Sequence, residues 1–215
     1  MTLAATPAPK VTPSRRSYWI RQNILWHWVS SGICLGGMLL FTVTGITLNH
    51  ASSISASPVV TQTMTPVPPA LQARFAAIKA EGKQAVPAEL AAWLANEFRV
   101  SPPESPAEWS ESEVYISLPR PGGDGWVSID RVTGIAKYER TDRGWIAYVN
   151  DLHKGRHTGP AWAYFIDVIV VAFLIFTLTG FILLQTHAPK RPSTWPLVAF
   201  GLIVPIALML LFVHK

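Results

Sequence analysis

Five of the six histidines have positions in the sequence that suit metal or cofactor binding. His27, His50 and His187 lie at the edges of two long apolar stretches, and His153 and His157 lie just before the second stretch. Ionisable side chains at a membrane are costly, so they are functional candidates by default. A neutral imidazole ring is also a common metal ligand. The histidines therefore predict a metal or cofactor site, provided that the elements carrying them bring rings together in pairs.

Those elements are three stretches of apolar sequence, residues 24–48, 161–184 and 195–213. The chain is 49% apolar and 14% charged, whereas globular proteins carry roughly 25% charge, and the shortfall is concentrated in these stretches. The second stretch contains one acid, Asp167, and the third contains none. A helix of ~20 apolar residues crosses a hydrocarbon core of ~30 Å. The sequence therefore predicts an integral membrane α-helical protein with three transmembrane helices.

The net charge of +5 might suggest nucleic acid as a partner, but the excess is local. Residues 51–157 contain eleven Lys and Arg against twelve Asp and Glu, so this soluble segment is close to neutral. The surplus lies beside the apolar stretches, at Arg15, Arg16, Arg21, Lys190 and Arg191. This is the distribution of the positive-inside rule, and we expect no nucleic-acid partner.

The same charges predict an orientation in a bacterial inner membrane. We expect a disordered cytoplasmic N-terminus at 1–20 and the first transmembrane helix at 21–50. A periplasmic domain would follow at 51–157. The second transmembrane helix, a cytoplasmic loop and the third helix are then expected at 158–187, 188–194 and 195–215.

The periplasmic segment is expected to form a small α+β domain. Its Ser, Thr and Pro-rich beginning, up to Pro69, is typical of a linker. Helical spacing follows at 71–79 and 87–98, and three prolines end that region. Strand patterns at 114–118, 126–130 and 135–139 are separated by a Gly-Gly-Asp-Gly turn and by Thr133-Gly134. One helical layer on a small antiparallel meander is the simplest architecture.

A weak repeat relates the first two apolar stretches. FTVTGI at 41–46 recurs as FTLTGF at 176–181, and each copy is followed by a histidine. Because the two helices would run in opposite directions, the pair is inverted. Together with these copies, the order of short motifs resembles the PepSY-associated transmembrane family. The matching pieces are LWHW at 25–28, TGI at 44–46, WVSID at 126–130 with Thr133-Gly134, DLHKG at 151–155 and TGF at 179–181.

The resemblance implies a PepSY-like periplasmic domain and b-type haem, because larger relatives look like inner-membrane ferric-siderophore reductases. One or two haems would be held by imidazole pairs, His27 with His187 and His50 with His153 or His157. Arg156 is a candidate partner for a haem propionate. Asp167 could orient a ligand histidine, or it could belong to a structural hydrogen-bond network.

Helix geometry limits this arrangement. His27 and His50 are 23 residues apart, or about 34 Å at ~1.5 Å per residue, so they lie at opposite interfaces. They differ by about 140° around a straight helix, whereas Gly45 shares the face of His27. His50 must therefore leave the helix, face a different neighbour or bind nothing.

These observations predict a protein that transfers electrons across the inner membrane to a periplasmic acceptor. The resemblance implies that this acceptor is iron-related, such as a ferric siderophore. The sequence shows no flavin fingerprint or phosphate loop, so the donor would be a quinol or another protein. Whether the chain is itself an oxidoreductase stays open. The alternatives are a haem-free accessory or anchor subunit that binds a periplasmic partner, and a metal-uptake helper that uses the loop at 153–157. A homodimer could supply ligands from two chains.

Overall fold

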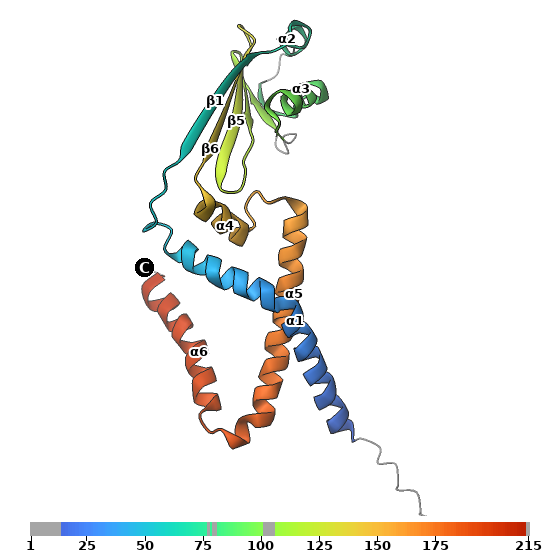
Figure 1. The fold of residues 1–215 in the computed structure, drawn as a ribbon, viewed down its shortest axis with the longest axis vertical. Helices are drawn as coiled ribbons and strands as arrows, with labels where there is room; N and C mark the ends of the chain where they lie inside the picture. The colour runs from blue at the N-terminus through green and yellow to red at the C-terminus, as the bar shows by residue number, and fades with distance from the viewer. Residues whose placement is uncertain (1–13, 77, 79–80, 101–105, 214–215) are drawn as a thin grey trace, which may run out of the picture. The chain divides into compact units, whose positions relative to one another are not determined.

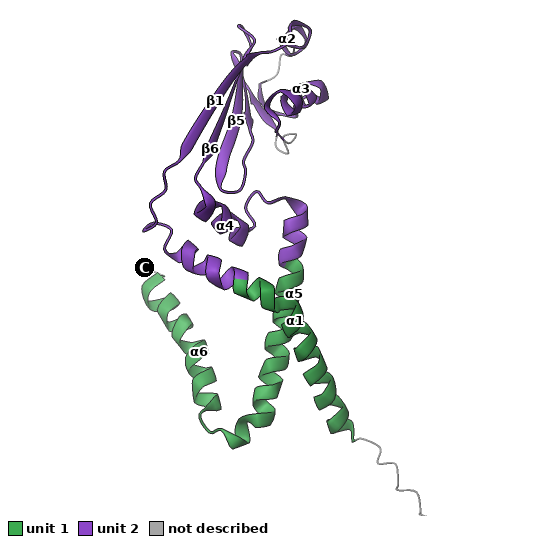
Figure 2. Cartoon of the chain, viewed as in Figure 1, with its two compact units in different colours: residues 1–39, 167–215 green, residues 40–166 purple. Residues whose placement is uncertain are grey.

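A computed structural model describes the chain except for residues 1–13, 77, 79–80, 101–105 and 214–215. The chain divides into two compact units (Figure 2). The helical unit contains the residues up to Leu39 and those from Asp167 onward, and the sheet unit contains Leu40–Ile166. Each unit has its own candidate histidines, so each is described by itself.

Three helices are long and apolar enough to cross a membrane, which confirms the three-helix prediction. They are α1 (Arg15–Asn49), α5 (Gly159–His187) and α6 (Thr194–Leu208). A 3₁₀ turn (Ala188–Lys190) follows α5, and a π-helical segment (Met209–Val213) continues α6. All backbone polar groups of a spanning helix are paired within the helix, which is why apolar stretches of this length fold this way in lipid.

The first helix begins earlier than expected. Residues 15–20 were expected to be disordered, but α1 starts at Arg15 and includes Tyr18 and Trp19. Tyr and Trp side chains favour the membrane interface. A helix that carries them can therefore continue beyond its apolar stretch. The remainder of the expected disordered segment, residues 1–13, lies outside the described residues.

Within the helical unit, α1 and α5 approach each other closely at Gly37. A Cβ atom at this position would lie 2.7 Å from the Ile169 side chain, so only glycine fits without a shift. Ile169 and Ala172 are buried at this contact side of α5. Small residues allow such close approach of helix backbones in membranes, where van der Waals packing supplies much of the association energy.

The sheet unit contains a six-stranded antiparallel sheet in the order β1-β6-β5-β4-β3-β2. The strands are β1 (Val59–Pro66), β2 (Gly82–Gln84), β3 (Ala107–Trp109), β4 (Glu113–Ser117), β5 (Gly123–Asp130) and β6 (Ile135–Asp142). Helices α2 (Pro69–Ala76) and α3 (Ala88–Phe98) cover one face of the sheet (Figure 1). The α+β fold class is confirmed.

The core lies between that face and the two helices. Phe75, Leu90 and Leu94 from the helices pack with the alternate residues of the central strands, Val114, Ile116, Val127 and Ile129. Successive side chains in a strand point to opposite faces, so each of β4 and β5 presents an apolar row to the helices and a more polar row to the other side.

Strand β1 lies in the segment expected to be a linker. It pairs with β6 over its whole length, from Val59 opposite Asp142 to Pro66 opposite Ile135. Buried and exposed positions do not alternate along β1, so the two-residue periodicity that predicts a strand is missing. Its valines and threonines nevertheless favour strand, and a proline is tolerated on an edge strand.

The expected Gly-Gly-Asp-Gly turn is also different, because β5 already begins at Gly123. Gly122, at φ +74°, forms the turn, and a Cβ there would lie 2.7 Å from the Cβ of Tyr148. Tyr148 belongs to α4 (Trp145–Lys154), a helix that the sequence did not predict. Asp151 of the same helix accepts a hydrogen bond from the Gly122 N–H at 2.9 Å. This turn therefore positions α4, which carries His153.

Candidate functional site

In the helical unit, His27 packs against the second copy of the repeated motif. Its Nδ1 lies 3.0 Å from Thr179 Oγ1 and 3.2 Å from the carbonyl oxygen of Phe176. The imidazole stacks on the Phe176 ring, with the centroids 4.6 Å apart and the planes at 18°. A Cβ at Gly180 would be 3.3 Å from His27 Cε1, so Gly180 makes room for the ring.

These contacts decide which ring nitrogen carries the proton. A carbonyl oxygen only accepts hydrogen bonds, and Thr179 Oγ1 donates its own hydrogen to the carbonyl of Ile175 at 2.7 Å. Nδ1 of His27 must therefore be the N–H donor. The lone pair of the neutral ring is then on Nε2, which is the arrangement of a metal-ligating histidine oriented by a neighbouring oxygen.

In the sheet unit, His153 makes the corresponding contact with the first copy of the motif. Its Nδ1 lies 2.7 Å from Thr44 Oγ1, and Thr44 donates to the carbonyl of Leu40 at 2.8 Å. The Phe41 ring meets the imidazole edge to face at 5.2 Å, and a Cβ at Gly45 would be 3.6 Å from His153 Cε1. The Thr-Gly repeat thus holds a histidine through its Nδ1 in both units.

His187 and His50 are exposed, and each is oriented by its own helix. Nδ1 of His187 lies 2.8 Å from the carbonyl of Leu183, and Nδ1 of His50 lies 2.9 Å from the carbonyl of Ile46. Both rings therefore donate from Nδ1 and leave Nε2 as the acceptor nitrogen. In His27, His50 and His187 a carbonyl oxygen lies at Nδ1, so Nε2 is the nitrogen left to bind a metal.

A cavity of about 540 Å³ brings His27 and His187 to one site within the helical unit. Its other lining residues are Gly180, Leu183, Leu184, Lys190, Arg191 and Thr194. Gly180 and His187 are seven residues apart, which puts them on one face of α5 about two turns from each other. The cavity thus combines two imidazoles, an apolar wall and two cations, and its size is typical of small-molecule and cofactor sites.

The second predicted pair, in the sheet unit, has a different geometry. His153 contacts Thr44 and lies beside Gly45, whereas His50 comes five residues after Gly45, about 140° further around the helix. The N–H of His50 still donates to the carbonyl of Ile46, so it follows the helix of α1 rather than turning away. His50 and His153 therefore face different sides of α1.

His157 and Arg156 follow the end of α4 rather than continuing it. Gly155 at φ 63° ends this helix, and His157 at φ 56° is exposed. His153 and His157 therefore do not share a helical face. Arg156 is exposed, and its backbone N–H donates to the carbonyl of Asp151. Within the described residues, no three His, Cys, Asp or Glu side chains form a metal cluster.

Asp167 does not orient a histidine. Among the described residues it has no hydrogen-bond partner, and the Nδ1 of His27 is held by Thr179 and Phe176 instead. The orienting residues Thr44 and Thr179 were not recognised as such in the sequence, where Thr-Gly is equally typical of helix packing. The signal that could have identified them is their place in a repeat that comes with histidines.

Comparison with known proteins gives one match. No curated protein and no solved structure matches the chain. A family model described as PepSY_TM-like matches residues 18–214, which include both copies of the repeat, the sheet unit and all three long helices. Because this match covers nearly the whole sequence, the chain belongs to the PepSY_TM-like family.

Proposed function

We propose that this protein is a b-type haem membrane protein that transfers electrons, with His27 and His187 as the axial ligands of one haem. The observation that carries the proposal is the cavity that both histidines line. Nδ1 of each ring lies against a carbonyl oxygen, so Nε2 is the nitrogen that would bind the iron. The bound haem would supply one-electron chemistry between ferric and ferrous iron.

The residues around the two histidines fit such a group. Leu183 and Leu184 supply an apolar wall, and Gly180 leaves the space that a side chain would fill. Lys190 and Arg191 at the same cavity are suitable partners for two propionates. Thr179 and the Phe176 carbonyl hold the His27 ring in one orientation and tautomer, which is what a preorganised ligand needs.

His153 is the ligand that we propose for a second haem. It is held by Thr44 as His27 is held by Thr179. Its partner imidazole is not His50 of the same chain, because the two lie on different sides of α1. A second copy of the chain is the source that the repeated geometry favours, since a homodimer brings two such histidines to one assembly.

The acceptor that we propose is a ferric compound of the siderophore class in the periplasm. The charge distribution beside the spans supports a periplasmic sheet unit. The sheet face that α2 and α3 do not cover presents Tyr115 and Trp126, stacked at 5.9 Å, with Lys137 Nζ 5.2 Å from the Trp126 ring centroid. Aromatic rings and a cation are suitable for a large, anionic, partly aromatic ligand.

The test is the reduced-minus-oxidised spectrum of the full chain purified from haem-replete cells. We expect b-type α and Soret bands, and a pyridine haemochrome count of one haem per chain, or more if His153 contributes. His27→Ala and His187→Ala should each remove the bands of the first haem. His157→Ala is the matched control and should leave them unchanged. A colourless protein, or a haem count per chain that neither substitution lowers, would show that these histidines are not haem ligands.

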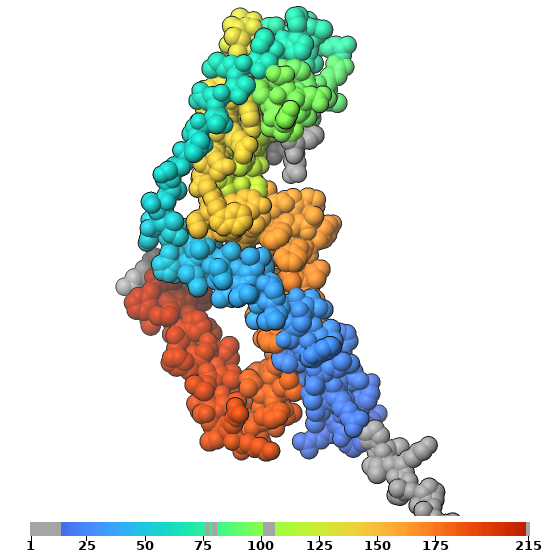
Figure 3. Space-filling view, viewed as in Figure 1, coloured from blue at the N-terminus to red at the C-terminus, as the bar shows by residue number. Residues whose placement is uncertain are grey.

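The second candidate is a haem-free accessory subunit that anchors or stabilises a larger membrane complex. One observation favours it. None of the described residues of α6 is buried, and in Figure 3 the side chains of this helix are open along the viewed face. An apolar helix with such a surface contacts lipid or another membrane protein. The spectrum separates the candidates, because this one requires a colourless protein in haem-replete cells.

A further inference from the structure

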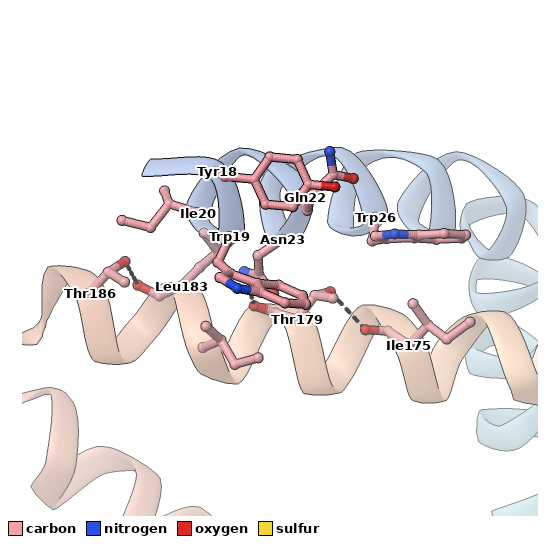
Figure 4. Close-up of a pocket in the computed structure, with 11 residues that line it drawn as sticks. Tyr18, Trp19, Ile20, Gln22, Asn23, Trp26, Ile175, Thr179, Leu183 and Thr186 are labelled. Atoms are coloured by element: carbon pink, nitrogen blue, oxygen red, sulfur yellow. Dashed lines mark hydrogen bonds between the residues drawn. The ribbon is translucent and has the colours of Figure 1, made fainter. Parts of the chain in front are cut away.

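A second cavity in the helical unit is lined by different types of residue from those of the histidine cavity. It has a volume of about 480 Å³ and lies between the beginning of α1 and the second half of α5. Its wall is mainly apolar, with Ile20 and Trp26 from α1 and Ile175, Ile182 and Leu183 from α5. Figure 4 shows Trp19 and Asn23 pointing from α1 toward α5 at this cavity.

Several polar groups at this cavity have no protein partner among the described residues. They are the indole N–H of Trp19, the amide of Gln22 and the hydroxyl of Tyr18. Asn23 donates from Nδ2 to the carbonyl of Thr179 at 3.0 Å, which leaves its Oδ1 as an acceptor. Tyr18 and Trp19 are exposed, so their polar groups are open to a ligand that enters the cavity. The cavity therefore suits a ligand with a polar head and an apolar body.

The charge of the lining narrows the class of ligand. None of the described residues that line this cavity is charged, whereas Lys190 and Arg191 line the histidine cavity. A phospholipid head carries a negatively charged phosphate, which favours cationic partners such as Arg and Lys. A neutral head with hydroxyl or carbonyl oxygens fits the Gln22 and Asn23 amides and the Trp19 N–H better.

We propose that this cavity binds the ring of an isoprenoid quinol. The ring is flat and aromatic, so Trp19 and Tyr18 can pack on it, and its two oxygens can exchange hydrogen bonds with Gln22 and Asn23. The tail extends along Ile175 and Ile182. The inference rests on the proposed function, for which a quinol is the membrane-dissolved electron donor. Thr179, which holds the Nδ1 of His27, also lines this cavity.

Binding can be measured without haem. The full chain is placed in nanodiscs of phosphatidylcholine that lack quinone, both as purified and after haem removal, and is exposed to a short-tailed ubiquinone carrying an azido group. After illumination, mass spectrometry identifies the labelled peptides. We expect label on residues 18–26 and 175–186, displaced by unlabelled short-tailed ubiquinone and not by added phosphatidylglycerol.

A matched pair of variants tests the polar contact. Gln22→Leu should weaken the competition by unlabelled ubiquinone about two- to tenfold, as the loss of one neutral hydrogen bond implies. Gln185→Leu changes an exposed glutamine of α5 outside the cavity and should have no effect. Label elsewhere, displacement by phosphatidylglycerol, or equal affinities for both variants would overturn the site.

The two proposals fail separately in this experiment. A colourless protein that is still labelled at the cavity retains the quinol site and loses the haem. A protein with b-type bands and no specific label retains the haem and loses the quinol site.

Discussion

Two threonines of this protein each hold a histidine. Thr44 and Thr179 lie within hydrogen-bond distance of the carbonyl four residues earlier, which is a common contact of threonine within a helix. The same oxygen also contacts Nδ1 of a histidine from another helix. One side chain thus contacts its own helix and orients the neighbouring ring.

Replacing Thr179 tests this role. Thr179→Val keeps the shape and removes the oxygen that accepts from His27 Nδ1, leaving the Phe176 carbonyl as the remaining acceptor. Loss of an outer-shell partner typically costs about 10- to 100-fold in metal affinity. We expect faster loss of haem to an excess of apo-globin and a shifted midpoint potential.

Thr177→Val is the control for that experiment. Thr177 is exposed, and its hydroxyl donates to the carbonyl of Phe173 without contacting a histidine. Equal haem retention in the two valine variants would contradict the orienting role of Thr179.

The sequence predicted part of this site. It identified His27 and His187 as a pair because their positions at the ends of two opposed helices follow from counting residues. It did not identify Thr179, because a hydrogen bond between helices depends on how the helices cross. It left open whether His153 or His157 matters. In the structure His153 contacts Thr44 from α4, whereas His157 follows Gly155, whose left-handed conformation ends that helix.

At the level of elements, the sheet is stabilised by one apolar face and by short hydrogen-bonded turns. The alternation in β4 and β5 was readable in the sequence because one face is buried by α2 and α3. Strand β1 was not readable, since its outer position in the sheet leaves both faces largely exposed. Pairing with β6, rather than local pattern, decides its structure.

Leu94 of α3 is the position at which packing of the sheet unit is most directly tested. It is fully buried between the helix and the sheet, so Leu94→Ala leaves a cavity and should lower the free energy of unfolding by about 2–5 kcal/mol. Urea unfolding in detergent, followed by near-ultraviolet circular dichroism, measures the change. Asn96→Ala, at an exposed position of the same helix, should have little effect, and a similar loss there would contradict the assignment.

Acid should weaken the turns of the same sheet. Backbone N–H groups of Thr133 and Val132 hold the pKa of Asp130 below 3.8, its usual value. The Gly144 N–H and Arg120 likewise lower the pKa of Asp142. A lowered folded pKa stabilises the fold above the unfolded value, and this contribution is lost as pH falls through the folded value.

We therefore expect the urea midpoint of the sheet unit to fall as pH decreases below about 4, the ordinary range of aspartate. Asp130→Asn keeps a side-chain oxygen for the turn but no longer titrates, so its midpoint should depend less steeply on pH. An unchanged slope would contradict the role assigned to this carboxylate.

For the whole molecule, the three long apolar helices and the intervening α+β domain were predictable from composition and periodicity. Chain length, charge depletion and apolar run length fix these features without reference to tertiary contacts. The helix that carries His153 was not predictable, because α4 is short and its place depends on the contacts of Asp151 and Tyr148 with the β4–β5 turn.

The orientation in the membrane stays a prediction, and cysteine labelling tests it. Cys34 is the one native cysteine and is buried, so Cys34→Ala gives a background without thiols. In that background, Glu111→Cys in the sheet unit should react with an impermeant thiol reagent in cells whose outer membrane is permeabilised. Ser17→Cys and Ser193→Cys should react only after lysis, and the reverse pattern would invert the orientation.

The hydrogen bonds from Nδ1 have a consequence for the direction from which a ligand can reach these rings. With that nitrogen already committed to an oxygen, His27 and His187 each have only the Nε2 edge left to meet a partner. A molecule that enters the cavity lined by both rings therefore meets imidazole edges whose directions the protein has set before binding.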